Sequence, residues 1–165
     1  MVTSVKVNWD LKERRSLSVS QRKNGEVVLA FIQARVSSTR FPNKIYQDLN
    51  GAPLLYHTIA RAKEASLVND VIVVSPAPLP GLPVGIREVV WDKDENDVLS
   101  RFYQCALANH SDYIVRLTSD CPLLDPNLID FIVNCAITAG AAYTSNVMKL
   151  TFPDGVDWVV MSKKM

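Results

Sequence analysis

The stretch that decides the fold is VVLAFIQARVSSTRFPNK, residues 27–44. Its first six residues form a continuous apolar run rich in β-branched and aromatic side chains, which is typical of a strand buried on both faces. After Gln33, residues 35–44 carry three cations and three hydroxyls. The segment therefore predicts a central strand that delivers a polar, basic loop to one edge of a sheet.

Strand and helix patterns alternate along the rest of the chain. Short apolar runs predict further strands at residues 71–74, 88–91, 113–117 and 141–146. Apolar residues at helical spacing predict helices that begin at Pro53, after the acidic residues 94–97, and at Pro126. This alternation indicates an α/β domain with a mostly parallel sheet.

One connection departs from the alternation. Residues 76–85 contain four prolines and two glycines. Because proline lacks an amide hydrogen and blocks helix interiors, we expect a loop here in place of a crossover helix.

The composition excludes several classes of protein. The chain has 165 residues, of which 48% are apolar and 21% charged, and its formal net charge is +1. This length suits one domain that folds without a disulfide or metal. No stretch of about 18 consecutive apolar residues is present, so we expect no transmembrane helix and no membrane partner. The near-neutral charge gives no support to nucleic-acid binding.

The three cysteines, Cys105, Cys121 and Cys135, are widely spaced and form no Cys-x-x-Cys pair. We therefore expect neither disulfides nor zinc, and a reducing, cytoplasmic location. Cys121 next to Asp120 could be a catalytic thiolate, but no histidine lies near it in sequence, and a small buried side chain is the simpler interpretation.

The N-terminal residues differ from the rest of the chain. Residues 1–25 hold six basic and two acidic residues, with sparse apolar residues and no apolar core of signal-peptide length. We expect a basic, disordered or loosely attached extension, followed by one domain at 26–165. Attraction of this extension to an acidic partner is the alternative.

Ligands of open α/β sheets bind beyond the carboxyl ends of the strands, and the loop after the first strand is suited to an anion. Arg35 and Arg40 can each present a guanidinium fork to phosphate oxygens, and Lys44 can act as a point charge. Hydroxyls and loop amides can complete the cradle. The alternative is a solvated basic loop. Neither the Walker motif nor the Gly-x-Gly-x-x-Gly fingerprint is present.

The strand at 113–117 leads into a second polar turn. Asp120 could supply a carboxylate to Mg²⁺, which binds one or two carboxylates together with substrate phosphates; a turn or capping aspartate is the alternative. Asp125, just before Pro126, is expected to cap the next helix. Asp97 and Arg101 could pair one helical turn apart.

These segments together resemble the cytidylyltransferase family that activates acidic sugars as CMP-sugars, and in particular its spore coat polysaccharide biosynthesis branch. The resemblance is carried, in order, by residues 32–44 (IQARVSSTRFPNK), 51–55 (GAPLL), 96–102 (NDVLSRF), 116–126 (RLTSDCPLLDP), 143–146 (YTSN) and 153–157 (PDGVD). Each motif alone is weak evidence for the family, whereas the whole set in this order is specific to it.

The resemblance implies a nucleotide-diphospho-sugar transferase fold, a three-layer α/β/α sandwich. It implies a reaction in which a sugar hydroxyl attacks the α-phosphate of CTP and pyrophosphate leaves, with CTP and an acidic sugar as partners, Mg²⁺ as cofactor and a homodimer as a candidate assembly. The catalytic residues it implies are Arg35, Lys44 and Asp120. The nucleotide-binding residues are Gln33, Arg35, Ser38, Thr39, Arg40, Lys44 and Arg116, and the metal ligands are Asp120 and Asp157.

The chain departs from this family at several points. Ser119 stands where many relatives have glycine, which matters if the position needs a positive φ. Val159 stands where this branch usually has an acidic residue. Relatives continue further and carry a Val-Asp-Thr-Pro-Glu-Asp segment with a second metal ligand, so we expect an incomplete C-terminal part and an exposed sheet edge.

Three functions therefore compete. The first is a cytidylyltransferase, or the nucleotide-binding portion of one. The second is a catalytically silent module that binds a nucleotide or sugar nucleotide, which the absent acidic segment favours. The third is a Rossmann-like regulator without a nucleotide, which leaves the polar strand ends unexplained.

Overall fold

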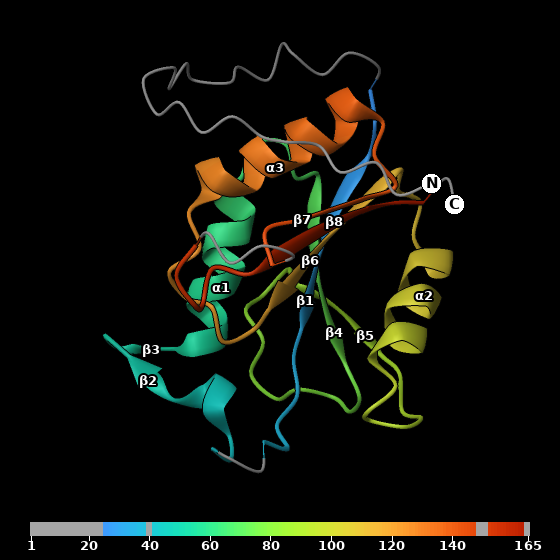
Figure 1. Ribbon diagram of the computed structural model, residues 1–165. Helices are drawn as coiled ribbons and strands as arrows, with labels where there is room; N and C mark the ends of the chain where they lie inside the picture. The colour runs from blue at the N-terminus through green and yellow to red at the C-terminus, as the bar shows by residue number, and fades with distance from the viewer. Residues whose placement is uncertain (1–24, 39–40, 148–151, 164–165) are drawn as a thin grey trace.

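A computed structural model of the chain describes residues 25–38, 41–147 and 152–163 (Figure 1). The predicted basic extension lies outside these residues, apart from Gly25, as do two of the predicted nucleotide-binding residues, Thr39 and Arg40.

A six-stranded sheet with the order β5-β4-β1-β6-β8-β7 forms the centre of the fold. β1 pairs in parallel with β4 on one side and with β6 on the other, and β5 extends the parallel part. β8 runs antiparallel to both β6 and β7. The strands are β1 (Val28–Gln33), β4 (Asp70–Ser75), β5 (Arg87–Val90), β6 (Tyr113–Thr118), β7 (Tyr143–Ser145) and β8 (Trp158–Ser162).

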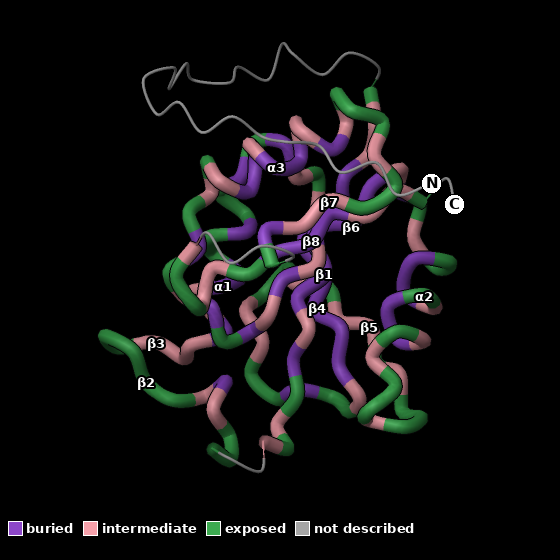
Figure 2. The backbone as a smooth tube through the Cα atoms, viewed as in Figure 1, coloured by how far each residue is buried: buried purple, intermediate pink, exposed green. Residues whose placement is uncertain are grey.

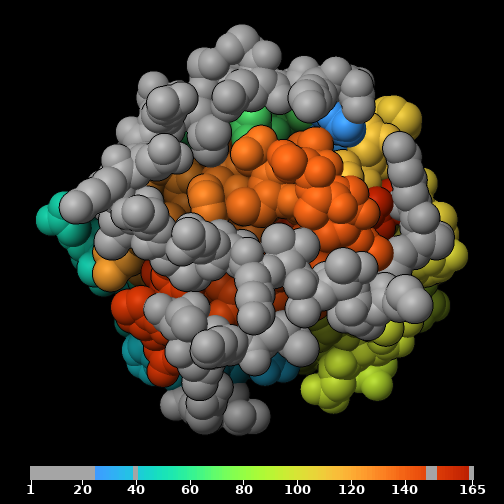
Figure 3. Space-filling view, turned by 45° about the horizontal axis from the view of Figure 1, so that its top comes forward, coloured from blue at the N-terminus to red at the C-terminus, as the bar shows by residue number. Residues whose placement is uncertain are grey.

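Helices cover both faces of this sheet, which confirms the three-layer α/β/α sandwich. α1 (Leu54–Glu64) and α3 (Pro126–Ala139) lie on one face, and α2 (Val98–Ala108) lies on the other (Figure 1). Figure 3 shows α3, in orange, as part of the outer surface of its layer. None of the helices in the described ranges is long and apolar enough to cross a membrane.

The alternation of β1 side chains sorts the core into two layers. Ala30 and Ile32 belong to the cluster under α1 and α3, whereas Leu29 and Phe31 pack with α2. All four residues are at most 4% exposed, so β1 is buried on both faces as predicted. In Figure 2 the buried positions follow the central strands and the inward faces of the helices.

Most predicted elements are present. Asp125 caps α3, because its side chain accepts a hydrogen bond from the Asn127 amide at 2.9 Å. Residues 76–86 connect β4 to β5 without a helix, as the prolines predict. The sequence interpretation missed β8, which lengthens the sheet beyond β6, and the short elements η2 (Lys44–Tyr46), β2 (Asp48–Leu49) and β3 (Ala52–Pro53).

One buried carboxylate joins α3 to the turn between α1 and β4. Asp130 is 8% exposed and accepts from the amides of Ser66 at 2.9 Å and Leu67 at 2.7 Å. Because both amides lie at the entry to β4, this contact fixes where the second core strand begins.

We predict that Asp130→Ala lowers the free energy of unfolding by about 2–3 kcal/mol, since two largely buried amides lose their acceptor. Urea denaturation checks this, with the exposed Asp92→Ala as the matched control, expected to change stability by less than about 0.5 kcal/mol. Equal stability of the two variants would contradict the assignment.

Candidate functional site

The carboxyl ends of β1, β4 and β6 meet at one edge of the sheet, where the loops that follow them are joined by hydrogen bonds. The Ala34 amide donates to the Val74 carbonyl at 3.0 Å, and the Ser119 amide donates to the Gln33 carbonyl at 3.1 Å. These bonds continue the parallel ladders into the loops, so the polar segments after β1 and β6 lie side by side.

An ion pair between Lys44 and Asp120 connects two of these loops. Lys44 Nζ donates to Asp120 Oδ2, although 76 residues separate them. Both side chains are about one-third exposed, at 32% and 36%. Burial opposes ionisation of Asp120, but the hydrogen bond and the charge of Lys44 outweigh it and hold the pKa of this carboxyl below its ordinary value. The structure thus joins two predicted catalytic residues.

Asp157, the second predicted metal ligand, lies near the same turn. The Cys121 thiol contacts the Asp157 backbone, and after burial and the Thr118 contact the charges of Asp120 and Asp157 act on that thiol. The backbone of Asp157 therefore lies at the Cys121 turn, which follows Asp120 directly in the chain. Among the described residues no group of three His, Cys, Asp or Glu side chains could hold a metal ion, so any divalent cation would draw its further ligands from substrate or water.

Cys121 itself has the environment of a structural thiol. It is 5% exposed, its Sγ lies 2.8 Å from Thr118 Oγ1, and burial raises its pKa above the ordinary value. A thiol that resists ionisation makes a poor nucleophile, so the structure favours the small buried side chain over the catalytic thiolate.

Gln33 and Arg116 form a second polar group, on the sheet face covered by α2. Arg116 Nη2 donates to Gln33 Oε1 at 2.9 Å, and its guanidinium lies 6.0 Å from the centre of the Phe102 ring. Ser38 has a local role, because its Oγ accepts from the Phe41 amide at 3.2 Å and thereby shapes the loop after β1.

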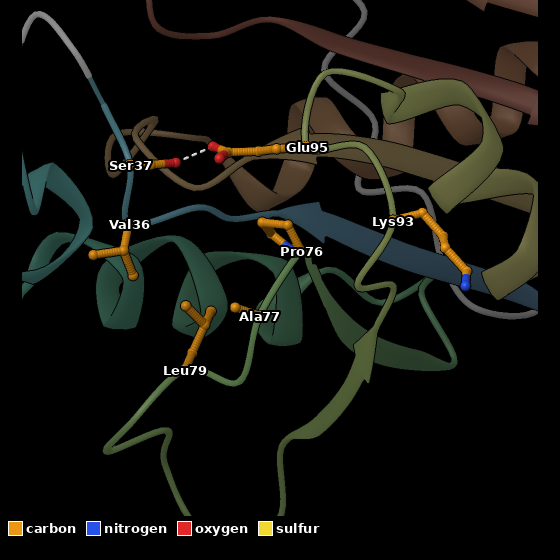
Figure 4. A pocket seen from close by; sticks show the side chains of 7 residues that line it. All are labelled: Val36, Ser37, Pro76, Ala77, Leu79, Lys93 and Glu95. Atoms are coloured by element: carbon orange, nitrogen blue, oxygen red, sulfur yellow. Dashed lines mark hydrogen bonds between the residues drawn. The ribbon is translucent and has the colours of Figure 1, made fainter.

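Arg35 contacts a residue that the sequence interpretation did not single out. Its Nη1 lies 3.5 Å from Glu95 Oε1, which also accepts from Ser37 Oγ. This contact links the loop after β1 to the segment before α2 and borders a cavity of about 280 Å³. The cavity is lined by Val36, Ser37, Pro76, Ala77, Leu79, Lys93 and Glu95 (Figure 4).

Asp97 and Arg101, which could pair by their spacing, form no ion pair in the described part of the chain. Asp97 caps α2 by accepting from the Ser100 amide at 3.0 Å. Arg101 is fully buried and donates from Nη2 to the Glu95 carbonyl at 2.8 Å, while its Nε and Nη1 have no partner in the part of the chain that the structure describes. Helical spacing could have revealed this, because Arg101 falls on the same face as Cys105, four residues later, inside the apolar stripe.

Ser119, the first departure from the family pattern, fits its position. The described residues other than glycine with positive φ are Asn43 and Asn50, so Ser119 has an ordinary backbone conformation. Its carbonyl accepts from Thr58 Oγ1 at 3.2 Å, which attaches the turn to α1.

We predict that the cysteines resist thiol reagents in the folded chain. Burial raises the pKa of all three thiols, and that of Cys105 reaches about 12, so little thiolate exists at pH 8. Labelling with a chromogenic disulfide at pH 8, located by mass spectrometry, should be slow until urea unfolds the chain. Rapid native labelling of Cys121 would contradict this.

The geometry agrees with what the comparisons find. A family model described as cytidylyltransferase matches residues 29–153. The chain is 34% identical over 106 residues to a 3-deoxy-manno-octulosonate cytidylyltransferase of Geotalea uraniireducens, covering 62% of this chain and 42% of that protein. It is 31% identical over 128 residues to the spore coat polysaccharide biosynthesis protein SpsF of Bacillus subtilis, covering 71% and 52%.

The fold has a solved counterpart. A cytidylyltransferase from Leptospira borgpetersenii superposes with a TM-score of 0.72 at 26% identity, over 83% of this chain and 60% of that one. The chain spans about half the length of the curated relatives it matches. The matched residues include β1, β6 and the turn with Asp120, and on these grounds the chain belongs to the cytidylyltransferase family.

Proposed function

We propose that this chain forms the nucleotide-binding part of an enzyme that transfers CMP from CTP to an acidic sugar, in the synthesis of a cell-surface polysaccharide. The observation that carries the proposal is the contact of Lys44 with Asp120 at the carboxyl ends of β1 and β6. Family membership and the names of two relatives, a 3-deoxy-manno-octulosonate cytidylyltransferase and a spore coat polysaccharide biosynthesis protein, support the substrate class.

In the proposed reaction an oxygen of the sugar forms a bond to the α-phosphorus of CTP. The bond from that phosphorus to the oxygen bridging the α- and β-phosphates breaks, pyrophosphate leaves, and the sugar hydroxyl loses its proton to water. Such a reaction depends mostly on positioning and on neutralising charge. Lys44 and Arg35 are the cations placed for this, with Arg40 as a further candidate outside the described residues.

The cavity beside the β1 loop suits the base of the nucleotide. Val36, Pro76, Ala77 and Leu79 supply apolar walls, and a volume of about 280 Å³ accommodates a small ring rather than a whole nucleotide. A base placed there would direct its phosphates along the β1 loop, toward the end that carries Lys44. We assign Gln33 and Arg116 a supporting role, because their side chains are already hydrogen-bonded to each other.

Asp120 and Asp157 are the residues that would hold a divalent cation such as Mg²⁺. Carboxylate oxygens are suitable ligands, and two are sufficient where phosphates supply the rest. When bound, the ion would neutralise charge on the phosphates. Without it, Lys44 holds the Asp120 carboxylate in an ionised form that can accept the ion.

Nucleotide binding without turnover is the second candidate. It requires only the cations of the β1 loop, Lys44 and Arg35, and no divalent cation. Pyrophosphate release from CTP with candidate acidic sugars separates the two candidates, since the enzyme releases it and the module binds CTP without release.

Three further proposals complete this function. The three cysteines are free, which suits a reducing, cytoplasmic location. We retain 1–25 as a basic extension of a domain at 26–165. A homodimer is the candidate assembly.

We predict that Lys44→Met weakens CTP binding roughly tenfold, because a charge-assisted contact to phosphate is lost. Isothermal titration calorimetry measures this, with Lys63→Met as the matched control, since Lys63 is exposed near the end of α1. Equal affinities of the two variants would contradict the assigned role of Lys44.

We predict that Asp120→Asn abolishes metal-dependent pyrophosphate release while leaving CTP binding without metal within about threefold, since the amide replaces a metal ligand and not a phosphate ligand. Undiminished release by Asp120→Asn would show that the carboxylate is not needed. No binding of CTP to the unaltered chain would overturn the proposed function as a whole.

A further inference from the structure

We infer that Glu95 selects cytosine over uracil in the cavity beside the β1 loop, and that the buried Arg101 positions Glu95 for this task. The inference rests on the proposed function, because it assumes that the cavity receives a pyrimidine base. It concerns two residues that neither the family motif nor the strand-end rule assigns to the base.

The lining of the cavity holds a single acidic group. Its walls are mostly apolar, and the polar residues among them are Ser37, Lys93 and Glu95. In Figure 4 the Glu95 side chain extends across toward Ser37, whereas the Lys93 ammonium points away from the apolar side chains. Glu95 is therefore the charged group best placed to meet the edge of a ring lying against Val36 and Leu79.

One carboxylate oxygen of Glu95 remains available as an acceptor. Ser37 Oγ and Arg35 Nη1 both donate to Oε1, and Oε2 accepts no hydrogen bond from the described residues. The side chain is 35% exposed, so Oε2 is accessible to a ligand. Because Oε1 is held from the β1 side, the orientation of the carboxylate is set before any nucleotide arrives.

The chemistry of a carboxylate distinguishes the two pyrimidines. An ionised glutamate only accepts hydrogen bonds. Cytosine presents an amino group at C4, which donates, whereas uracil presents a carbonyl oxygen there, which accepts and would be repelled. Carboxylates read cytosine in this way where proteins contact exposed base edges.

Arg101 fixes the backbone from which Glu95 projects. Its Nη2 donates to the Glu95 carbonyl at 2.8 Å from a fully buried position on α2. Its other two nitrogens, Nε and Nη1, are buried and have no hydrogen-bond partner among the described residues, which is a costly arrangement that packing alone does not explain. Asp94 tightens the same segment by accepting from the Asn96 amide at 2.8 Å. Glu95 is thus held at its backbone by Arg101 and at its carboxylate by Ser37 and Arg35.

The test measures the dissociation constants of CTP and UTP by calorimetry for the 165-residue chain and for Glu95→Gln. We expect the unaltered chain to prefer CTP by roughly tenfold, the effect of one charge-assisted hydrogen bond at a half-exposed site. A glutamine amide can turn to donate or to accept, so the preference in Glu95→Gln should fall below about threefold.

The ratio of the UTP and CTP dissociation constants is the informative quantity. Glu95→Gln removes a negative charge beside Arg35 and should therefore strengthen binding of both triphosphates. Glu64→Gln is the matched control, since Glu64 pairs with Arg61 on the surface of α1 and should leave the ratio unchanged. An unaltered chain without preference, or an unchanged ratio in Glu95→Gln, would overturn the inference. Failure of the unaltered chain to bind either nucleotide would instead overturn the proposed function.

Two substitutions test the positioning role of Arg101. Arg101→Lys keeps one donor within reach of the Glu95 carbonyl and should retain most of the preference for CTP. Arg101→Met removes the donor and should reduce the ratio as far as Glu95→Gln does. If Arg101→Met lowers the melting temperature but keeps the tenfold ratio, Arg101 is structural only and its part of the inference is wrong. If Arg101→Met does not fold, Arg101→Lys decides: a retained ratio supports the role, and a lost ratio at an unchanged melting temperature contradicts it.

Discussion

The pairing of β1 with a parallel strand on each side is the constraint on which the rest of the structure depends. Because β1 is bonded to β4 and β6 in one direction, the loops that follow all three strands emerge at the same edge of the sheet. A strand in this position must be apolar on both faces, and residues 28–32 are. The charged residues of this region are consequently confined to the point where the strand ends.

The same constraint explains how charge is distributed at the site. Lys44 reaches Asp120 across the β1–β6 boundary, and Arg35 reaches Glu95 across the loop toward α2. Among the described residues of the β1 loop, both cations are therefore balanced by a carboxylate from another loop. An incoming triphosphate would compete with these carboxylates, so the arrangement holds the cations in place without leaving them unpaired.

Sequence patterns predicted the part of the site that depends on strand ends. The runs that form β1 and β6 are short and apolar, so their ends and the polar residues after them could be located, and the meeting of Lys44 with Asp120 follows from parallel pairing. β8 was missed because residues 153–157 were interpreted as a family motif and the residues after them were assigned no strand, although Trp158 and Val160 are buried against α3. Thr39 and Arg40 remain predictions.

The contact of Glu95 with Ser37 could not be predicted, because it joins segments 58 residues apart and depends on the path of the loop before α2. An acidic run before a helix indicates a cap, and here Asp97 alone has that role. Spacing alone left open a pair of Arg101 with Asp97, whereas the position of Arg101 in the apolar stripe of α2 places it in the core. In both cases tertiary packing decided which contacts formed, and sequence spacing does not show them.

The central claim is that loops at one edge of the sheet together form the nucleotide site. Amide hydrogen exchange with and without CTP tests this claim most directly. Binding should slow exchange in residues 34–38, 76–79, 93–97 and 118–121 together, while α3 stays unchanged. Protection confined to one of these segments, or located on α3 or the β7 edge, would contradict the account.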